Sequence, residues 1–231
     1  MKINKKVIVR FTLILVFFVG VFMLFSNQIQ QFIVRKNSES FSISNYSREE
    51  IEKNQKEKNA VFDFTSVEPI STSAVFKAQL NKNKQSQPVV AGIAVPSVNI
   101  NLPIFIGVAN ENLLWGAGTL SPTQQMGRGN YALASHLSYD PEALFSPLEH
   151  AQIGEKIYLN DLENIYEYEI YTKDWVEPDA MYVLDDVPGK SIVTLVTCGD
   201  FDATSRLIIQ GSLIEVKLVS QADEAVLSAF K

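Results

Sequence analysis

The hydrophobic and polar positions of this chain divide it into three parts. An apolar stretch runs from Val7 to Phe25, residues 26–88 are mostly polar, and from Val89 onward short apolar runs alternate with glycines and polar turns. The first part has the length of a membrane-spanning helix, and the last has the pattern of short strands and turns that is typical of a β domain. The pattern therefore predicts a membrane anchor, a stalk and one folded domain.

The apolar stretch is interpreted as an uncleaved signal-anchor. Its 19 residues come close to the roughly 20 that span a bilayer as a helix. Three lysines precede it, basic flanks stay in the cytosol, and Arg10 near that end can extend to the headgroups. A cleaved signal peptide needs a shorter apolar core and a small-residue cleavage site, which the residues after Phe25 do not offer. We expect residues 1–6 in the cytoplasm, one transmembrane helix at 7–25 and the rest outside the cell.

Residues 26–88 are expected to form an extracellular stalk or linker. Ser47, with Glu50 three positions later, has the spacing of a capping box and predicts a short polar helix. Sparse apolar positions between 61 and 76 are candidates for packing on the domain that follows. The polar run 81–88 predicts the final linker.

Residues 89–231 are expected to form one mainly β domain. Many short strands with few helices indicate a closed barrel or a sandwich. Short helical segments are expected at 110–114, 141–151 and 178–184. The predicted strands cover residues 89–95, 98–106, 130–136, 155–160, 165–174, 190–197 and 205–218.

The charge is unevenly distributed. Residues 1–85 carry 13 Lys/Arg and 7 Asp/Glu, a net of +6, whereas residues 86–231 carry 7 Lys/Arg and 19 Asp/Glu, a net of −12. Nucleic-acid binding draws on phosphate neutralisation, so the acidic domain is a poor candidate for it. A field of this sign favours cationic substrates, such as lysine-rich peptides or amines.

Cys198 is the only cysteine of the chain, and it ends a β-branched run. Structural cysteines of exported proteins usually occur in pairs. A single one is either an inert buried residue or a reactive thiol. The sequence alone leaves both readings open.

A cysteine nucleophile needs a proton acceptor and a group that stabilises the oxyanion. Of the two histidines, His136 ends a strand of small and apolar residues, while His150 resembles a solvated helix end. Arg206 begins the strand that follows Cys198, and the loop between them suits an antiparallel pair. Arg128 lies between two glycines and is interpreted as a surface residue. Cys198, His136 and Arg206 are therefore the candidate catalytic residues, although each taken singly is also compatible with a structural role.

These residues resemble those of the sortases, the membrane-anchored cysteine transpeptidases of Gram-positive bacteria. The family pattern Thr-Leu-x-Thr-Cys with an arginine about eight residues later is matched by residues 194–198 and Arg206. Ala134-Ser135-His136-Leu137 matches the family histidine, and Ile93–Pro96 and Leu102–Ile104 resemble the opening strands. Leu113–Gly118 resembles the first helix and turn. The resemblance covers about residues 89–218.

The resemblance implies an eight-stranded closed β-barrel and a defined reaction. Cys198 would attack the Thr–Gly bond of a Leu-Pro-x-Thr-Gly (LPXTG) sorting signal, His136 would protonate the leaving amine, and Arg206 would stabilise the oxyanion. An amine of the cell-wall precursor lipid II would then resolve the thioester, so that surface proteins are anchored to the wall. The substrate-binding residues implied are Thr197, Leu195, Ala134, Ser135, Trp175 and Val176.

The single N-terminal anchor resembles the housekeeping class A enzymes of streptococcal type. Class C enzymes, which polymerise pilins, usually add a C-terminal membrane segment and a lid with an Asp-Pro-aromatic motif. Neither is seen here, since Asp174-Trp175 lacks the proline. No cofactor is predicted, and Glu177, Asp179, Asp185 and Asp186 permit calcium activation without predicting it. Calcium activation and a homodimer through the anchor are left open.

Three alternatives compete with this interpretation. A plain cysteine protease of papain or caspase type does not fit, because neither the order of cysteine and histidine nor the caspase signature matches. A pilin-polymerising sortase and a membrane-tethered binding module with an inert cysteine remain as alternatives. The sequence leaves open the residue at the variable sorting position, the acceptor amine and the protonation state of the Cys–His pair.

Overall fold

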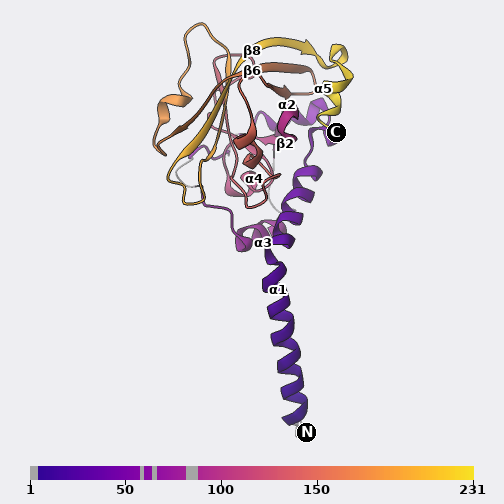
Figure 1. Cartoon of the computed structure of the whole chain (residues 1–231). Helices are drawn as coiled ribbons and strands as arrows, with labels where there is room; N and C mark the ends of the chain where they lie inside the picture. The colour runs from indigo at the N-terminus through magenta and orange to yellow at the C-terminus, as the bar shows by residue number, and fades with distance from the viewer. Residues whose placement is uncertain (1–4, 58–59, 64–66, 82–87) are drawn as a thin grey trace.

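The computed structural model describes residues 5–57, 60–63, 67–81 and 88–231. A β-barrel forms the body of the molecule, and one long helix projects from it, with the N-terminus at its far end (Figure 1). Lys2 of the basic N-terminus and residues 82–87 of the predicted final linker lie outside the described residues.

Eight strands close into a barrel in the order β1-β2-β3-β4-β7-β8-β6-β5 within the described part of the chain. This confirms the predicted barrel and excludes the sandwich. β2–β3 and β4–β7 pair in parallel, and the other neighbours pair antiparallel. The strands are β1 Val89–Val95, β2 Ile100–Phe105, β3 Ala117–Thr119, β4 Asn130–Ala134, β5 Lys156–Asn160, β6 Asn164–Val176, β7 Ile192–Cys198 and β8 Arg206–Leu218.

Apart from α1, the helices are short. The segments predicted at 141–151 and 178–184 form only short 3-10 turns. The α-helices are α1 Lys5–Ser40, α2 Arg48–Asn54, α3 Thr72–Asn81, α4 Asn110–Leu113 and α5 Glu224–Ser228. The 3-10 turns are η1 Ile43–Asn45, η3 Pro96–Val98, η4 Ser146–His150, η5 Met181–Leu184 and η6 Val219–Gln221.

The segment that the hydropathy pattern presents as a polar stalk contributes to the hydrophobic core. Val34, Ile43, Ile51 and Val75 are almost fully buried in the same cluster as the barrel side chains. The packing is close at Gly92 of β1, where an added Cβ would lie 2.8 Å from the Ile43 side chain. The predicted capping box at the start of α2 is confirmed, and part of the predicted 61–76 cluster packs on the domain. The barrel and this N-terminal segment therefore share one hydrophobic core.

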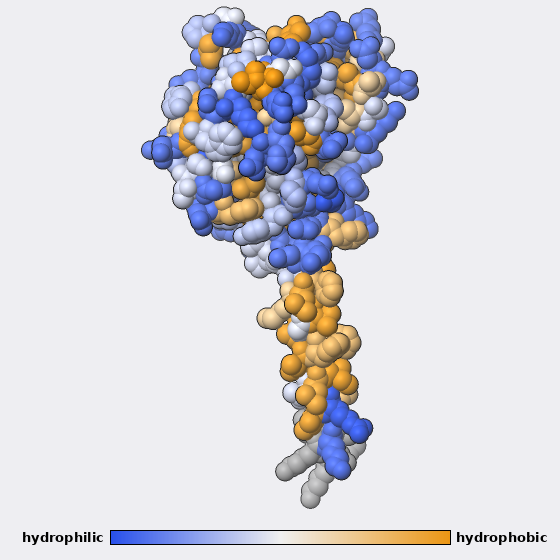
Figure 2. All heavy atoms as spheres, in the orientation of Figure 1, coloured by the Kyte–Doolittle hydropathy of each residue, from blue (hydrophilic) through white to orange (hydrophobic). Residues whose placement is uncertain are grey.

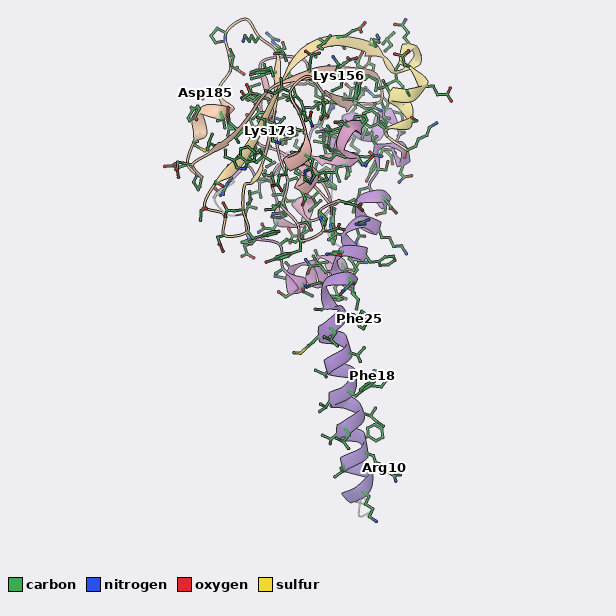
Figure 3. The ribbon with its side chains drawn as sticks, in the orientation of Figure 1. Arg10, Phe18, Phe25, Lys156, Lys173 and Asp185 are labelled. Carbon is green, nitrogen blue, oxygen red and sulfur yellow. The ribbon has the colours of Figure 1, made fainter. Side chains whose placement is uncertain are left out.

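The outer half of α1 carries its apolar side chains on the surface. Large side chains between residues 9 and 25 are exposed, and they form an apolar column below the barrel (Figure 2). Phe18 and Phe25 project sideways from the helix (Figure 3). In the described residues no single helix meets the length and hydropathy needed to cross a membrane. The pair Val9–Val21 and Met23–Ser40, bent by 48°, meets that requirement only when taken together.

Candidate active site

The parallel pairing of β4 with β7 brings His136 next to Cys198. Ala134 pairs with Val196, and the Ser135 N–H donates to the Val196 carbonyl at 3.1 Å. His136 and Cys198 each lie two residues beyond that last pair, at the same end of two strands that run about 4.8 Å apart. The two residues line one cleft. Their proximity, which the sequence cannot supply, follows from this register.

Arg206 lies directly opposite Cys198 in the antiparallel ladder of β7 and β8. Side chains of such a pair lie on the same face of the sheet, with Cβ atoms about 5 Å apart. The loop between them is fixed by Asp200, which accepts hydrogen bonds from Ser205 Oγ at 2.7 Å and from the Thr204 N–H at 3.0 Å. Arg206 Nη1 donates to the carbonyls of Ala203 and Ser205 in the same loop. The guanidinium is therefore held beside the thiol.

The cleft that contains these three side chains has a volume of about 130 Å³. Ser135 also lines it, and the Ser135 Oγ donates to the Gly116 carbonyl at 2.8 Å. Tyr139 and Phe201 form one wall, and residues 67–70 of the N-terminal segment form another. These wall residues were not identified from the sequence, although each aromatic follows a catalytic candidate by three positions.

Burial keeps the cysteine and the histidine uncharged. Burial raises the pKa of the Cys198 thiol, and the Asp200 carboxylate raises it further. The Arg206 guanidinium lowers this pKa but offsets only part of the rise. Burial lowers the pKa of His136 to about 4. At neutral pH the resting pair is a thiol and a neutral imidazole, so the proton must move between them as the thiolate forms.

Three buried side-chain nitrogen or oxygen atoms lack a hydrogen-bond partner among the described residues: Trp115 Nε1, Thr197 Oγ1 and Arg206 Nε. Thr197 precedes Cys198 in the sequence, and Arg206 pairs with Cys198 across the β7–β8 ladder. An unsatisfied buried donor costs about 1–3 kcal/mol. A substrate carbonyl that accepts from Arg206 Nε would recover that cost.

An apolar groove meets the cleft at Arg206, which lines both. Val176 lies in this groove, opposite Arg206 in the β6–β8 ladder, and Ala134 packs below it against Val196. The other apolar groups come from the ends of the barrel strands and from the β6–β7 loop: Leu120, Pro178, Ala180, Met181, Val183, Leu184 and Ile208. The groove offers an apolar surface that leads to the nucleophile.

The remaining predicted residues occupy varied positions. Leu195 is fully buried in the barrel core, because it lies on the face of β7 opposite to Cys198, and it does not line the groove. Trp175 is half-exposed and packs against Gly199, where an added Cβ would lie 2.9 Å from the indole. His150 and Arg128 are exposed, as predicted.

The acidic residues of the β6–β7 loop do not gather into a metal site. No group of three or more His, Cys, Asp or Glu side chains that could hold a metal ion occurs in the described part of the chain. Asp186 instead accepts a hydrogen bond from the Asn130 N–H at 2.7 Å, and Asp185 lies on the same loop (Figure 3).

A closed barrel with a cysteine, a histidine and an arginine in one cleft defines a cysteine-dependent acyl transferase. The Sortase domain family matches residues 93–214. The chain is 44% identical to Sortase A of Streptococcus agalactiae over 222 residues, which cover 94% of this chain and 89% of that protein. The solved structure of Listeria monocytogenes sortase A superimposes with a TM-score of 0.58 at 38% identity, covering 62% of this chain and 97% of that one.

A third comparison concerns the fold alone. Sortase C-3 from Streptococcus pneumoniae gives a TM-score of 0.62 at 19% identity, covering 84% of this chain and 97% of that one. The chain belongs to the sortase family. It is a cysteine transpeptidase of the sortase A type, an enzyme that anchors surface proteins.

Proposed function

We propose that the enzyme cleaves LPXTG sorting signals between threonine and glycine and transfers the acyl group to a primary amine of a cell-wall precursor. The observation that carries this proposal is the meeting of the apolar groove and the Cys198–His136 cleft at Arg206. The leucine and proline of the signal fit the groove lined by Val176 and its neighbours. The threonine carbonyl then reaches Cys198.

Acylation begins with proton transfer from the Cys198 thiol to His136, since both are neutral at rest. The sulfur attacks the threonine carbonyl carbon, and the developing oxyanion accepts hydrogen bonds from the Arg206 guanidinium, whose Nε has no other partner among the described residues. The C–N bond to glycine breaks as His136 returns its proton to the leaving amine. Thr197 supports the oxyanion or substrate beside the nucleophile.

Deacylation reverses these steps with a different amine. The acceptor nitrogen attacks the thioester carbonyl, the C–S bond breaks, and the acceptor proton passes to His136 and then to the thiolate. An amide bond replaces the thioester, and the enzyme returns to its resting state. Water would give hydrolysis instead, so the acceptor must be favoured over water.

The proposal includes a tether to the membrane. Residues 7–25 would span the bilayer, residues 1–6 would lie in the cytoplasm, and the catalytic domain at 89–231 would lie outside the cell with residues 26–88 between. The exposed apolar side chains of α1 and the basic N-terminus support this orientation. The acidic charge of the catalytic domain favours donors with a basic tail and acceptors with an amine.

The test is a ligation assay with a fluorescent LPXTG peptide, with and without a primary amine. We expect a ligated product with the amine and slow hydrolysis without it. Hydrolysis alone would support a plain protease, and no cleavage with an unreactive Cys198 would support an inert binding module.

A further inference from the structure

An exposed aromatic pair stands at the mouth of the catalytic cleft. The rings of Tyr139 and Phe201 are stacked, with centroids 4.3 Å apart and planes 5° from parallel. Tyr139 lies three residues after His136, and Phe201 lies three residues after Cys198. The pair therefore connects the loop that follows His136 to the loop that follows Cys198.

The pair does not serve the hydrophobic core. Tyr139 is 64% exposed and Phe201 is 55% exposed, and neither belongs to a core cluster of the described residues. A stacked aromatic pair contributes only about 0.5–1.5 kcal/mol beyond its buried area. Large aromatic surfaces exposed beside a reactive cleft are better suited to binding a ligand.

The loops that carry the two rings are held by hydrogen bonds to the neighbouring aspartates. Asp140, next to Tyr139, accepts two hydrogen bonds from Arg35 of α1, at 2.6 Å to Nε and 2.7 Å to Nη2. Asp200, next to Phe201, is bound by the hydroxyls and N–H groups of its own loop. The aromatic wall is therefore preorganised on two anchored loops, which lowers the entropic cost of binding.

The wall lines the cleft but not the groove that is proposed to hold the donor. The donor groove approaches Cys198 from the β6–β7 loop and meets the cleft at Arg206, which lines both. Neither Tyr139 nor Phe201 lines that groove. A second substrate that attacks the thioester then has the cleft lined by the two rings available to it.

The chemistry of this entrance fits a primary ammonium on a short chain. The aromatic faces can pack against the chain and attract a cation. Glu68 and Asp200 line the same cleft, and the Asp200 carboxylate is anionic because hydrogen bonds lower its pKa to about 2. An anionic acceptor would be repelled, and a chainless nucleophile would gain nothing from the rings.

We propose that Tyr139 and Phe201 form the acceptor-binding wall of the enzyme, and that they position the chain carrying the attacking amine. The inference rests on the proposed transpeptidation. The acceptor packs against the rings as an ammonium and loses one proton to solvent before it reacts. Its neutral nitrogen then attacks the thioester carbonyl, the C–S bond to Cys198 breaks, and the second amine proton passes through His136 to the thiolate. The pair thereby favours aminolysis over hydrolysis.

The experiment compares full-length wild type with Tyr139→Ala, Phe201→Ala and Tyr139→Phe in detergent. Each enzyme receives the LPXTG peptide alone, with triglycinamide, or with hydroxylamine, which is a nucleophile without a chain. In both alanine variants we expect a five- to tenfold higher KM for triglycinamide, corresponding to the loss of about 1 kcal/mol of aromatic contact, and a matching shift toward hydrolysis. Donor kcat/KM and the hydroxylamine KM should stay within about twofold, as for a change that leaves acylation intact.

Two comparisons make the result decisive. Tyr139→Phe keeps the stack and should behave as wild type, and Ile153→Ala removes an exposed apolar side chain (68% exposed) that lines neither the cleft nor the groove. An unchanged triglycinamide KM in both alanine variants overturns the proposal. An equal loss of donor kcat/KM and of both acceptor reactions also overturns it, because the pair would then only support the fold of the site. A wild type that cleaves no donor refutes the proposed function itself.

Discussion

The ion pair between Arg35 and Asp140 connects α1 to the loop that follows His136, and its removal should destabilise the protein. The Asp140 side chain is only 3% exposed, and its carboxylate is held by two charged hydrogen bonds from Arg35, which is 48% exposed. Arg35→Ala leaves that carboxylate buried with the Glu142 N–H as a remaining donor.

The magnitude follows from the exposure of the two partners. Breaking a fully buried pair costs about 3–5 kcal/mol, and an exposed pair contributes at most about 1 kcal/mol. With one partner buried and the other half-exposed, we expect a loss of about 1–3 kcal/mol. For a domain of this size, that lowers Tm by roughly 2–12 °C.

The assay is thermal unfolding of the full-length chain in detergent, followed by near-UV circular dichroism. Arg35 lowers the pKa of Asp140. The stabilisation is therefore present above the unfolded pKa of about 4 and is lost as pH falls through the folded value. Asp140→Asn added to Arg35→Ala should recover part of the loss, and the exposed neighbour Lys36→Ala serves as the control. An Arg35→Ala Tm equal to wild type at pH 7 would refute the idea that α1 stabilises the loop that follows His136.

Four further outcomes are expected. Arg206→Ala should lower kcat/KM for the donor about 10²-fold, the usual effect of losing an oxyanion donor, and near-normal turnover would remove Arg206 from the mechanism. The pH profile of donor kcat/KM should be flat from pH 6 to 8, because the pKa of His136 is lowered to about 4 and that of the nucleophilic thiol is raised; an acid limb near pH 6.5 would contradict this. Gly92→Ala should destabilise the chain by about 1–3 kcal/mol through overpacking against Ile43, with partial recovery on Ile43→Ala, and equal Tm values would disprove that contact. Raising salt to physiological strength should weaken the apparent donor affinity if the acidic charge of residues 86–231 steers it.

The sequence predicts the strands well and the packing of the N-terminal segment poorly. The alternation of apolar and polar residues, and the glycines between the apolar runs, locate seven of the strands within a few residues. The strand β3, Ala117–Thr119, is too short and its side chains too small to give such a pattern. Ile43 and Val75 are isolated apolar positions in polar surroundings, so their burial depends on partners far along the chain. Hydropathy therefore presents a stalk where the structure has a packed layer.

One contact of the candidate site could be predicted from the sequence, and another could not. The pairing of Cys198 with Arg206 could be expected because a short loop joins two strands, and such strands pair antiparallel. The approach of His136 to Cys198 could not, because it depends on a parallel pair formed across some sixty residues. Leu195 was assigned to the groove, although period-two alternation in β7 already placed it on the face opposite to Cys198.

The central claim is that Cys198 carries the acyl group between donor and acceptor. Intact mass and peptide mapping of the full-length enzyme, quenched shortly after mixing with an LPXTG peptide, test it directly. We expect an adduct on Cys198 with the mass of the donor up to its threonine, absent in Cys198→Ala and discharged by a primary amine into the ligated product. An adduct on another residue, or donor turnover by Cys198→Ala, would contradict it.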